Sequence, residues 1–217
     1  MRRFHRHLAG LGLAATESFG FALAGGYAVS EHGMGDRLSM DVDLFTDVFD
    51  PDAFRAAGDR LRAAYERDGL VVDVNRVGPV FLDLHVQDGR TGESSDVQLG
   101  VNFRAFPPRV LSVGPVLDAR DAVAGKMSAL WSRGEARDYI DIDTVVGSGR
   151  FSRDDVLRLA DEQEALPLDR GMLADRFRGA ERHSIEVYAL YAVDAERRAA
   201  IVGRFLSWAD EIDPDRA

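Results

Sequence analysis

The segment MDVDLF contains two aspartates, Asp41 and Asp43, with one residue between them. Ser39 precedes Asp41 by two positions. Apolar residues alternate with Asp41 and Asp43, which is the pattern of a β-strand with one apolar and one polar face. On such a strand the two carboxylates project to the same side, roughly 7 Å apart. Like charges at that spacing repel unless a cation neutralises them, and Mg²⁺ prefers carboxylate oxygens. The pair therefore indicates either a magnesium site or the solvated face of an edge strand.

A glycine pair, Gly25 and Gly26, lies upstream of the aspartates, between an apolar segment and a short stretch of helical character. Glycine lets backbone N–H groups come close to a phosphate, particularly where a turn leads into a helix. Ser39, on the same strand face as Asp41, adds a hydroxyl donor for a triphosphate oxygen. Together these residues favour a site for a metal-bound nucleotide, and the alternative is a glycine turn without a ligand.

The segment KMSALWSRGEARDYIDID, residues 126–143, carries a second group of charged residues. On one continuous helix, four of them would share an arc of roughly 80°: Lys126, Arg133, Arg137 and Asp141. Cations in one stripe repel mildly, so the stripe is better explained beside an anion such as a phosphate. The alternative is a solvated face in which Arg137 pairs with Asp141. Gly134 can divide the helix, and Asp138, off the stripe, can orient a neighbouring arginine.

The elements that must hold these residues change character along the chain. Alternation and turn residues predict strands over five segments: 19–26, 40–46, 70–77, 80–88 and 94–103. Capping residues predict a helix over 50–69, and from about Asp118 the pattern is helical almost throughout. The predicted fold class is α+β, with a small mixed β-sheet and flanking helices over residues 1–115 and a helical half over residues 116–217.

Composition limits the class of protein. The chain has 217 residues, of which 46% are hydrophobic and 29% charged, so a packed core in one domain or two small ones is expected. The absence of cysteine excludes disulfides and thiolate metal sites. The same absence fits a reducing cytoplasm, where we expect the protein, and the lack of an apolar run of transmembrane length predicts no membrane partner. A net charge of −10 disfavours proteins that coat nucleic acid non-specifically.

In this order, the two groups of residues resemble the AbiEii/AbiGii nucleotidyltransferase toxins, which include the MenT toxins of mycobacteria. The glycine pair, a helix and D-x-D on the next strand are similar to the nucleotidyltransferase superfamily signature. The string K-x₆-R-x₃-R-D-x₂-D is similar to the second motif of the toxins. The resemblance covers residues 20–145, whereas residues 150–217 match only in being helical and have no assigned task.

The resemblance implies a magnesium-dependent enzyme that transfers a nucleoside monophosphate from an NTP to the 3′ end of tRNA. Such an enzyme blocks translation and has a cognate antitoxin protein as partner. By the same resemblance Asp41 and Asp43 would hold Mg²⁺, and Lys126 and Asp141 would complete the catalytic set. The nucleotide-binding residues that the resemblance implies are Gly25, Gly26, Ser39, Arg133 and Arg137.

Two features depart from this pattern and leave alternatives open. Many nucleotidyltransferases carry a third metal-binding carboxylate on a later strand, where this chain has Gly100, with Asp83 or Asp96 as substitutes. Binding of tRNA by an acidic protein needs a basic face, for which the candidates are Arg104, Arg109, Arg120, Arg133 and Arg137. The alternatives are transfer to a hydroxyl of a protein or of a small molecule such as an aminoglycoside, and a non-catalytic domain that binds a nucleotide or a partner.

Overall fold

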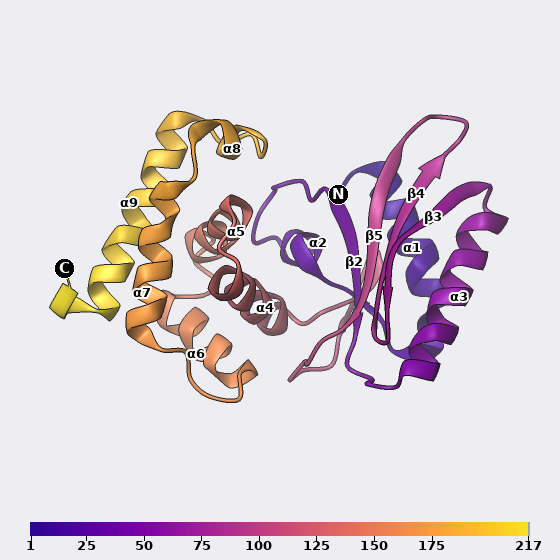
Figure 1. Ribbon diagram of the computed structural model, residues 1–217, viewed down its shortest axis with the longest axis horizontal. Helices are drawn as coiled ribbons and strands as arrows, with labels where there is room; N and C mark the ends of the chain where they lie inside the picture. Colours follow the sequence, from indigo (N-terminus) through magenta and orange to yellow (C-terminus); the bar gives the residue numbers. More distant parts are fainter. Residues whose placement is uncertain (217) are drawn as a thin grey trace. The chain divides into compact units, whose positions relative to one another are not determined.

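The computed structural model describes residues 1–216, and the chain divides into two compact units. The sheet unit consists of Met1–Gly33 and Leu38–Ala122, and the helical unit consists of Met34–Arg37 and Val123–Ala217. The first holds a mixed β-sheet with its helices, and the second is built from helices (Figure 1). The predicted α+β class, with a mixed sheet followed by a helical C-terminal half, is confirmed.

The sheet has the strand order β3-β4-β5-β2-β1-β7-β6. Its strands are β1 (Ala22–Leu23), β2 (Asp41–Thr46), β3 (Leu70–Gly78), β4 (Phe81–Asp88), β5 (Ser94–Val101), β6 (Arg109–Leu111) and β7 (Gly114–Val116). β2 pairs parallel with β5 and antiparallel with β1, so the strand that carries the two aspartates lies inside the sheet rather than at its edge. The expectation of an edge strand as the bland alternative is therefore wrong.

Three helices belong to the sheet unit: α1 (Arg3–Ala15), α2 (Gly25–Glu31) and α3 (Pro51–Arg67). α1 and α3 lie on the same side of the sheet (Figure 1). α3 begins where predicted because the Asp50 carboxylate accepts hydrogen bonds from the first N–H groups, and proline suits the first helical position. The apolar side chains of β2, Val42 and Leu44, are fully buried, which leaves the opposite face of the strand to its carboxylates.

The helical unit is formed by the greater part of α4 (Ala119–Ser132) and by α5 (Ala136–Gly147), α6 (Arg153–Gln163), α7 (Arg170–Arg178), α8 (Ile185–Ala189) and α9 (Ala195–Ile212). α7 and α9 run side by side (Figure 1) and share an aromatic core in which the rings of Phe177 and Trp208 are 4.6 Å apart. Tyr139 of α5 packs edge-on against Phe205 of α9, with ring centroids 5.0 Å apart. The C-terminal helices thus support α5, the helix that carries Asp141.

None of the helices in the described part of the chain is long and apolar enough to cross a membrane.

Candidate active site

The carboxylates of β2 occupy the polar face of that strand. Asp41 and Asp43 are partly exposed, whereas the alternating residues Val42 and Leu44 are buried. This is the two-residue period that the sequence predicts for a half-buried strand. Ser39, just before the strand, is buried, and its hydroxyl donates a hydrogen bond of 2.7 Å to Asp41 Oδ1. The serine expected to face a phosphate therefore also orients the first carboxylate.

The backbone of Gly25 lies directly against the second carboxylate. A Cβ atom at this position would be 1.8 Å from Asp43 Oδ2 and 2.7 Å from its Cγ. Gly25 also has a φ of +60°, which side chains other than that of glycine rarely adopt. The preceding residue, Ala24, donates its N–H to the Asp43 carbonyl at 2.8 Å. Gly25 and Gly26 are the first residues of α2 rather than a turn before it. The glycine pair therefore lies at the start of a helix, as expected, but the helix begins two residues earlier than predicted.

The parallel pairing of β2 with β5 shows which residues of β5 lie beside the aspartates, where a third metal-binding carboxylate is expected. The register sets Asp96 beside Asp41 and places Gly100 beside Phe45, beyond both aspartates. Asp96 Oδ1 is 2.8 Å from His85 Nδ1, on the next strand. Asp83 is buried and lies 3.5 Å from Arg76 Nε. Within residues 1–216 no three Asp, Glu or His side chains come close enough to hold a metal ion, so the carboxylates of β2 form a pair.

In the helical unit, Asp141 binds two cations. Lys126 Nζ lies 2.8 Å from Asp141 Oδ2, and Arg37 makes a two-pronged contact through Nε and Nη2 at 2.6 and 2.9 Å. The side chains of Lys126, Arg37 and Asp141 are 10%, 9% and 5% exposed. The Arg37 guanidinium also lies over the ring of Tyr191, 5.4 Å from its centroid. Asp141 is thus held by two cationic side chains within a buried cluster.

The charge of Asp141 is fixed by its partners. Burial raises the pKa of this carboxyl, but Lys126 and Arg37 outweigh that effect and hold the pKa below its ordinary value. Asp141 is therefore ionised near neutral pH, and its oxygens are taken up by Lys126 and Arg37. This suits a residue that holds two cations and does not suit a general base.

The charged stripe predicted over residues 126–141 is not one helix face. α4 ends at Ser132 and α5 begins at Ala136, with Gly134 between them at a φ of +62°. Arg133 lies in this break and donates to both oxygens of the fully buried Asp138, at 3.0 and 2.8 Å. The Asp138 carboxylate also accepts the Glu135 N–H in a capping box. Asp138 thus orients an arginine, as expected, and fixes the start of α5.

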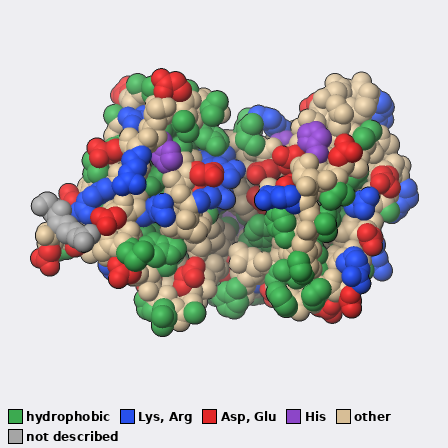
Figure 2. Space-filling model, in the orientation of Figure 1, with side chains coloured by type: hydrophobic (Ala, Val, Ile, Leu, Met, Phe, Trp, Pro, Cys, Tyr) green, Lys and Arg blue, Asp and Glu red, His purple; other side chains and the backbone are tan. Residues whose placement is uncertain are grey.

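The arginines considered for a basic face are paired with carboxylates of their own unit. In the sheet unit, Arg104 contacts Asp47, and both Arg109 and Arg120 contact Asp118. These contacts hold the pKa of Asp118 well below its usual range, through Arg120 first. In the helical unit, Arg137 Nε is 2.9 Å from Glu135 Oε2. Figure 2 accordingly shows acidic and basic side chains interspersed over the visible face of the helical unit.

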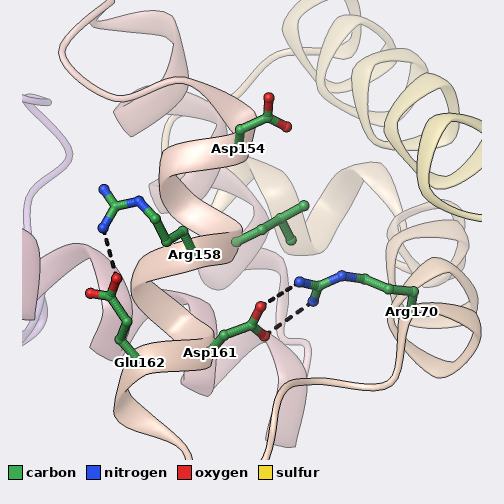
Figure 3. Close-up of a pocket in the computed structure, with 6 residues that line it drawn as sticks. Asp154, Arg158, Asp161, Glu162 and Arg170 are labelled. Atoms are coloured by element: carbon green, nitrogen blue, oxygen red, sulfur yellow. Dashed lines mark hydrogen bonds and ion pairs between the residues drawn. The ribbon is translucent and has the colours of Figure 1, made fainter.

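A hollow of about 380 Å³ beside α6 illustrates the same pairing of charges. Arg158 and Arg170 line it together with acidic residues of α6, as Figure 3 shows. Arg158 Nη1 is 2.9 Å from Glu162 Oε1, and Arg170 contacts Asp161 at 2.5 Å. Because these cations are already paired with carboxylates, the hollow is a weak candidate for an anionic ligand.

Arg37 is the residue of the cluster around Asp141 that sequence reasoning missed. It stands two positions before Ser39, in a loop whose residues belong to the helical unit. Its partner Asp141 is 104 residues away in the sequence, and neither helical nor strand periodicity connects residues so far apart. The only local signal is an arginine close to the serine and the aspartates, which is too common to predict a buried ion pair.

A family model described as "Nucleotidyl transferase AbiEii toxin, Type IV TA system" matches residues 13–207 of the chain. The chain belongs to the AbiEii family of nucleotidyltransferase toxins. The resemblance inferred from the two motifs is thereby confirmed, and AbiEii toxins act within toxin–antitoxin systems of type IV. A search of curated proteins gives no match.

Solved structures share the AbiEii fold of this chain. JHP933 from Helicobacter pylori has a TM-score of 0.56 at 14% sequence identity, and the match covers 98% of this chain and 93% of that chain. MenT4, a nucleotidyltransferase toxin from Mycobacterium tuberculosis H37Rv, has a TM-score of 0.57 at 15% identity, covering 98% of this chain and 85% of that chain. These likenesses support the nucleotidyltransferase-like fold.

Gly25→Ala should reduce nucleotidyl transfer much more than a control substitution that costs a similar amount of stability. The φ of +60° makes alanine unfavourable by about 1–2 kcal/mol, and the new Cβ would also force Asp43 to move. Gly33→Ala is the matched control, because Gly33 has a φ of +70° but no atom within 4 Å of the added Cβ. We expect similar losses in urea unfolding, but a loss of nucleotidyl transfer of about 100-fold or more for Gly25→Ala alone. Equal activities of the two variants would contradict the contact with Asp43.

Asp141→Asn should destabilise the protein in a pH-dependent way, since it leaves two buried cations without their carboxylate. We expect a loss of about 3–5 kcal/mol in the free energy of unfolding near pH 7. Because the folded pKa of Asp141 lies below its ordinary value of 3.8, the ionised group stabilises the fold above about pH 4. As the pH falls further, the wild type loses this contribution, and the difference between the two proteins should shrink.

The control for this experiment is Asp143→Asn on the same helix. Asp143 makes a similar two-pronged contact with Arg204, at 2.6 and 2.9 Å, but the Arg204 side chain is 52% exposed. We expect this variant to lose about 1 kcal/mol or less. Urea unfolding between pH 3 and 7 provides the comparison, and equal losses for the two variants would refute the special role of the buried cluster.

Proposed function

We propose that this AbiEii-family protein transfers a nucleoside monophosphate from an NTP to the 3′ end of tRNA and that a cognate antitoxin restrains it. The observation that carries the proposal is the fit of the Gly25 backbone against Asp43, with Ser39 bonded to Asp41. It combines a close backbone approach with two carboxylates on one strand face, the two features that a metal-bound triphosphate requires. These substrates place the proposed reaction in the cytoplasm.

The donor set of β2 fits Mg²⁺. This ion typically takes one or two protein carboxylates and completes its shell with water and substrate phosphates. Asp41 and Asp43 supply such a pair, and a third carboxylate is not required. When bound there, Mg²⁺ neutralises phosphate charge and favours attack at phosphorus. Gly25, Gly26 and Ser39 would then contact the triphosphate from the protein side.

The cations of the helical unit have a separate part in the proposal. Lys126 and Arg37, whose positions Asp141 fixes, would supply cationic donors of the kind that phosphate oxygens bind. Asp141 would hold both cations in place. Arg133 and Arg137 could join in phosphate binding only at the expense of their contacts with Asp138 and Glu135. We therefore assign them a supporting role.

The proposed reaction is a substitution at the α-phosphorus of the NTP. The acceptor hydroxyl oxygen forms a bond to phosphorus, the bond from phosphorus to the β-phosphate oxygen breaks, and pyrophosphate leaves. The acceptor loses its hydroxyl proton to solvent. The protein's contribution to such a step is to position the reactants and to neutralise charge.

Because the candidate arginines contact carboxylates, a second acceptor, a hydroxyl of a protein or a small molecule, is also favoured. An enzyme that binds tRNA needs cations that are available to phosphates, yet the five candidate arginines all contact carboxylates. A hydroxyl of a protein or a small molecule would not need a basic face. We retain tRNA as the primary proposal because the family consists of nucleotidyltransferase toxins, and the experiment separates the two acceptors.

The test is to incubate the purified protein with total tRNA, Mg²⁺ and each α-labelled NTP in turn. We expect label to enter RNA with the wild type, but not with Asp41→Ala or in the presence of EDTA. Asp68→Ala, which alters an aspartate at the surface of the sheet unit beside His7, should behave as the wild type. Label in protein or small molecules alone would favour the second acceptor, and absence of pyrophosphate release with every acceptor would refute nucleotidyl transfer.

A further inference from the structure

A chain of buried hydrogen bonds leads from α1 through α2 to the first carboxylate. His5 Nδ1 lies 2.6 Å from the Tyr27 hydroxyl oxygen, and the Tyr27 hydroxyl donates to the Ser39 carbonyl at 3.2 Å. The Ser39 hydroxyl in turn donates to Asp41 Oδ1 at 2.7 Å. His5, Tyr27 and Ser39 are only 2%, 1% and 3% exposed. All four residues belong to the sheet unit.

We propose that His5 and Tyr27 are positioning residues that hold the Ser39 segment, and through it the Asp41 carboxylate, in the geometry needed for nucleotidyl transfer. The catalytic consequence rests on the function proposed above. The hydrogen-bonded link itself does not, because it can be observed in the protein without substrate.

His5 and Tyr27 are polar residues among mainly apolar buried neighbours. His5 lies on the buried side of α1 together with Phe4 and Leu8, and Tyr27 lies among buried residues of α2. Apolar side chains of similar size would fill this space without the cost of removing polar groups from water. A polar network whose members are matched does more than fill space, since each hydrogen bond permits only a narrow range of positions. The end of this network is a carboxylate of the candidate site.

The hydrogen bonds fix the direction in which each proton points. A tyrosine hydroxyl carries one proton, and Tyr27 donates it to the Ser39 carbonyl. The contact of 2.6 Å with His5 therefore needs a proton on His5 Nδ1. Burial, followed by the charge of Arg2, lowers the pKa of His5 and outweighs the opposing effect of Asp41. A lowered pKa favours the neutral imidazole, and a neutral ring that donates from Nδ1 toward Tyr27 satisfies both hydrogen bonds.

One short helix thereby controls both carboxylates. Gly25, at the start of α2, lies against Asp43, while Tyr27, two residues later, holds the Ser39 segment that contacts Asp41. The rigid spacing of helix residues makes these two contacts interdependent. A displacement of α2 would move both contacts together, and the bond from His5 ties the helix to α1.

The experiment compares Tyr27→Phe with Tyr65→Phe, each of which removes one buried hydroxyl and keeps the ring. Tyr65 is the matched control, because it is fully buried in the same unit and donates to the Leu8 carbonyl at 3.0 Å, away from Ser39. The direct readout is the NMR chemical shift of the Ser39 carbonyl carbon and of the Asp41 carboxylate carbon. We expect both signals to move in Tyr27→Phe and neither to move in Tyr65→Phe.

The catalytic readout is the division of the effect between kcat and KM. We expect Tyr27→Phe to lower kcat about tenfold, with the KM for NTP nearly unchanged, because a small misplacement of reacting groups costs rate rather than substrate binding. Ser39→Ala should lower kcat to a similar extent and, because Ser39 is also proposed to contact the triphosphate, should raise the KM for NTP as well. Since both changes interrupt one chain, the double variant Tyr27→Phe/Ser39→Ala should be no slower than the slower single variant.

Several results would overturn the proposal. An unmoved Asp41 carboxylate signal in Tyr27→Phe would show that the network does not reach the carboxylate. Additive losses in the double variant, or equal kcat values for Tyr27→Phe and Tyr65→Phe, would exclude a positioning role in catalysis. If the wild type transfers no nucleotide while both NMR signals still move, the proposed function fails and the structural link from His5 to Asp41 stands.

Discussion

The approach of the Gly25 backbone to the Asp43 carboxylate is the constraint on which the sheet unit depends. It requires a residue without a Cβ, at a φ of +60°, at the start of α2. It also requires that β2 bury Val42 and Leu44 so that the aspartates face the other way. The helices α1 and α3 provide that burial from one side of the sheet. The fold therefore brings two like charges and a backbone segment together on one face of β2, where the two carboxylates repel each other.

The helical unit contains a buried cluster of charged side chains. There, Lys126 and Arg37 are buried against the carboxylate of Asp141. The aromatic core of α7 and α9, which packs on Tyr139, holds the helix that carries Asp141.

The sequence predicted the parts of this arrangement that local patterns encode. Alternation located β2, β4 and β5, and the Asp50–Pro51 pair located the start of α3, because these signals act over a few residues. The three-residue strands β6 and β7 are too short to show a period, so they were missed. Arg37 and the network through His5 and Tyr27 depend on contacts between distant segments. Only the folded chain shows such contacts, and it also shows that Gly134 divides the expected basic helix face.

The most direct test of the central claim is calorimetric titration with an NTP analogue whose α,β-bridging oxygen is replaced by a methylene group. Wild-type protein, Asp43→Asn and the surface control Asp68→Asn would each be titrated with Mg²⁺ and with EDTA. The account predicts that removal of Mg²⁺ weakens binding at least about tenfold in the wild type and in Asp68→Asn, and that Asp43→Asn loses this dependence. Equal affinity of the wild type with Mg²⁺ and with EDTA would contradict it.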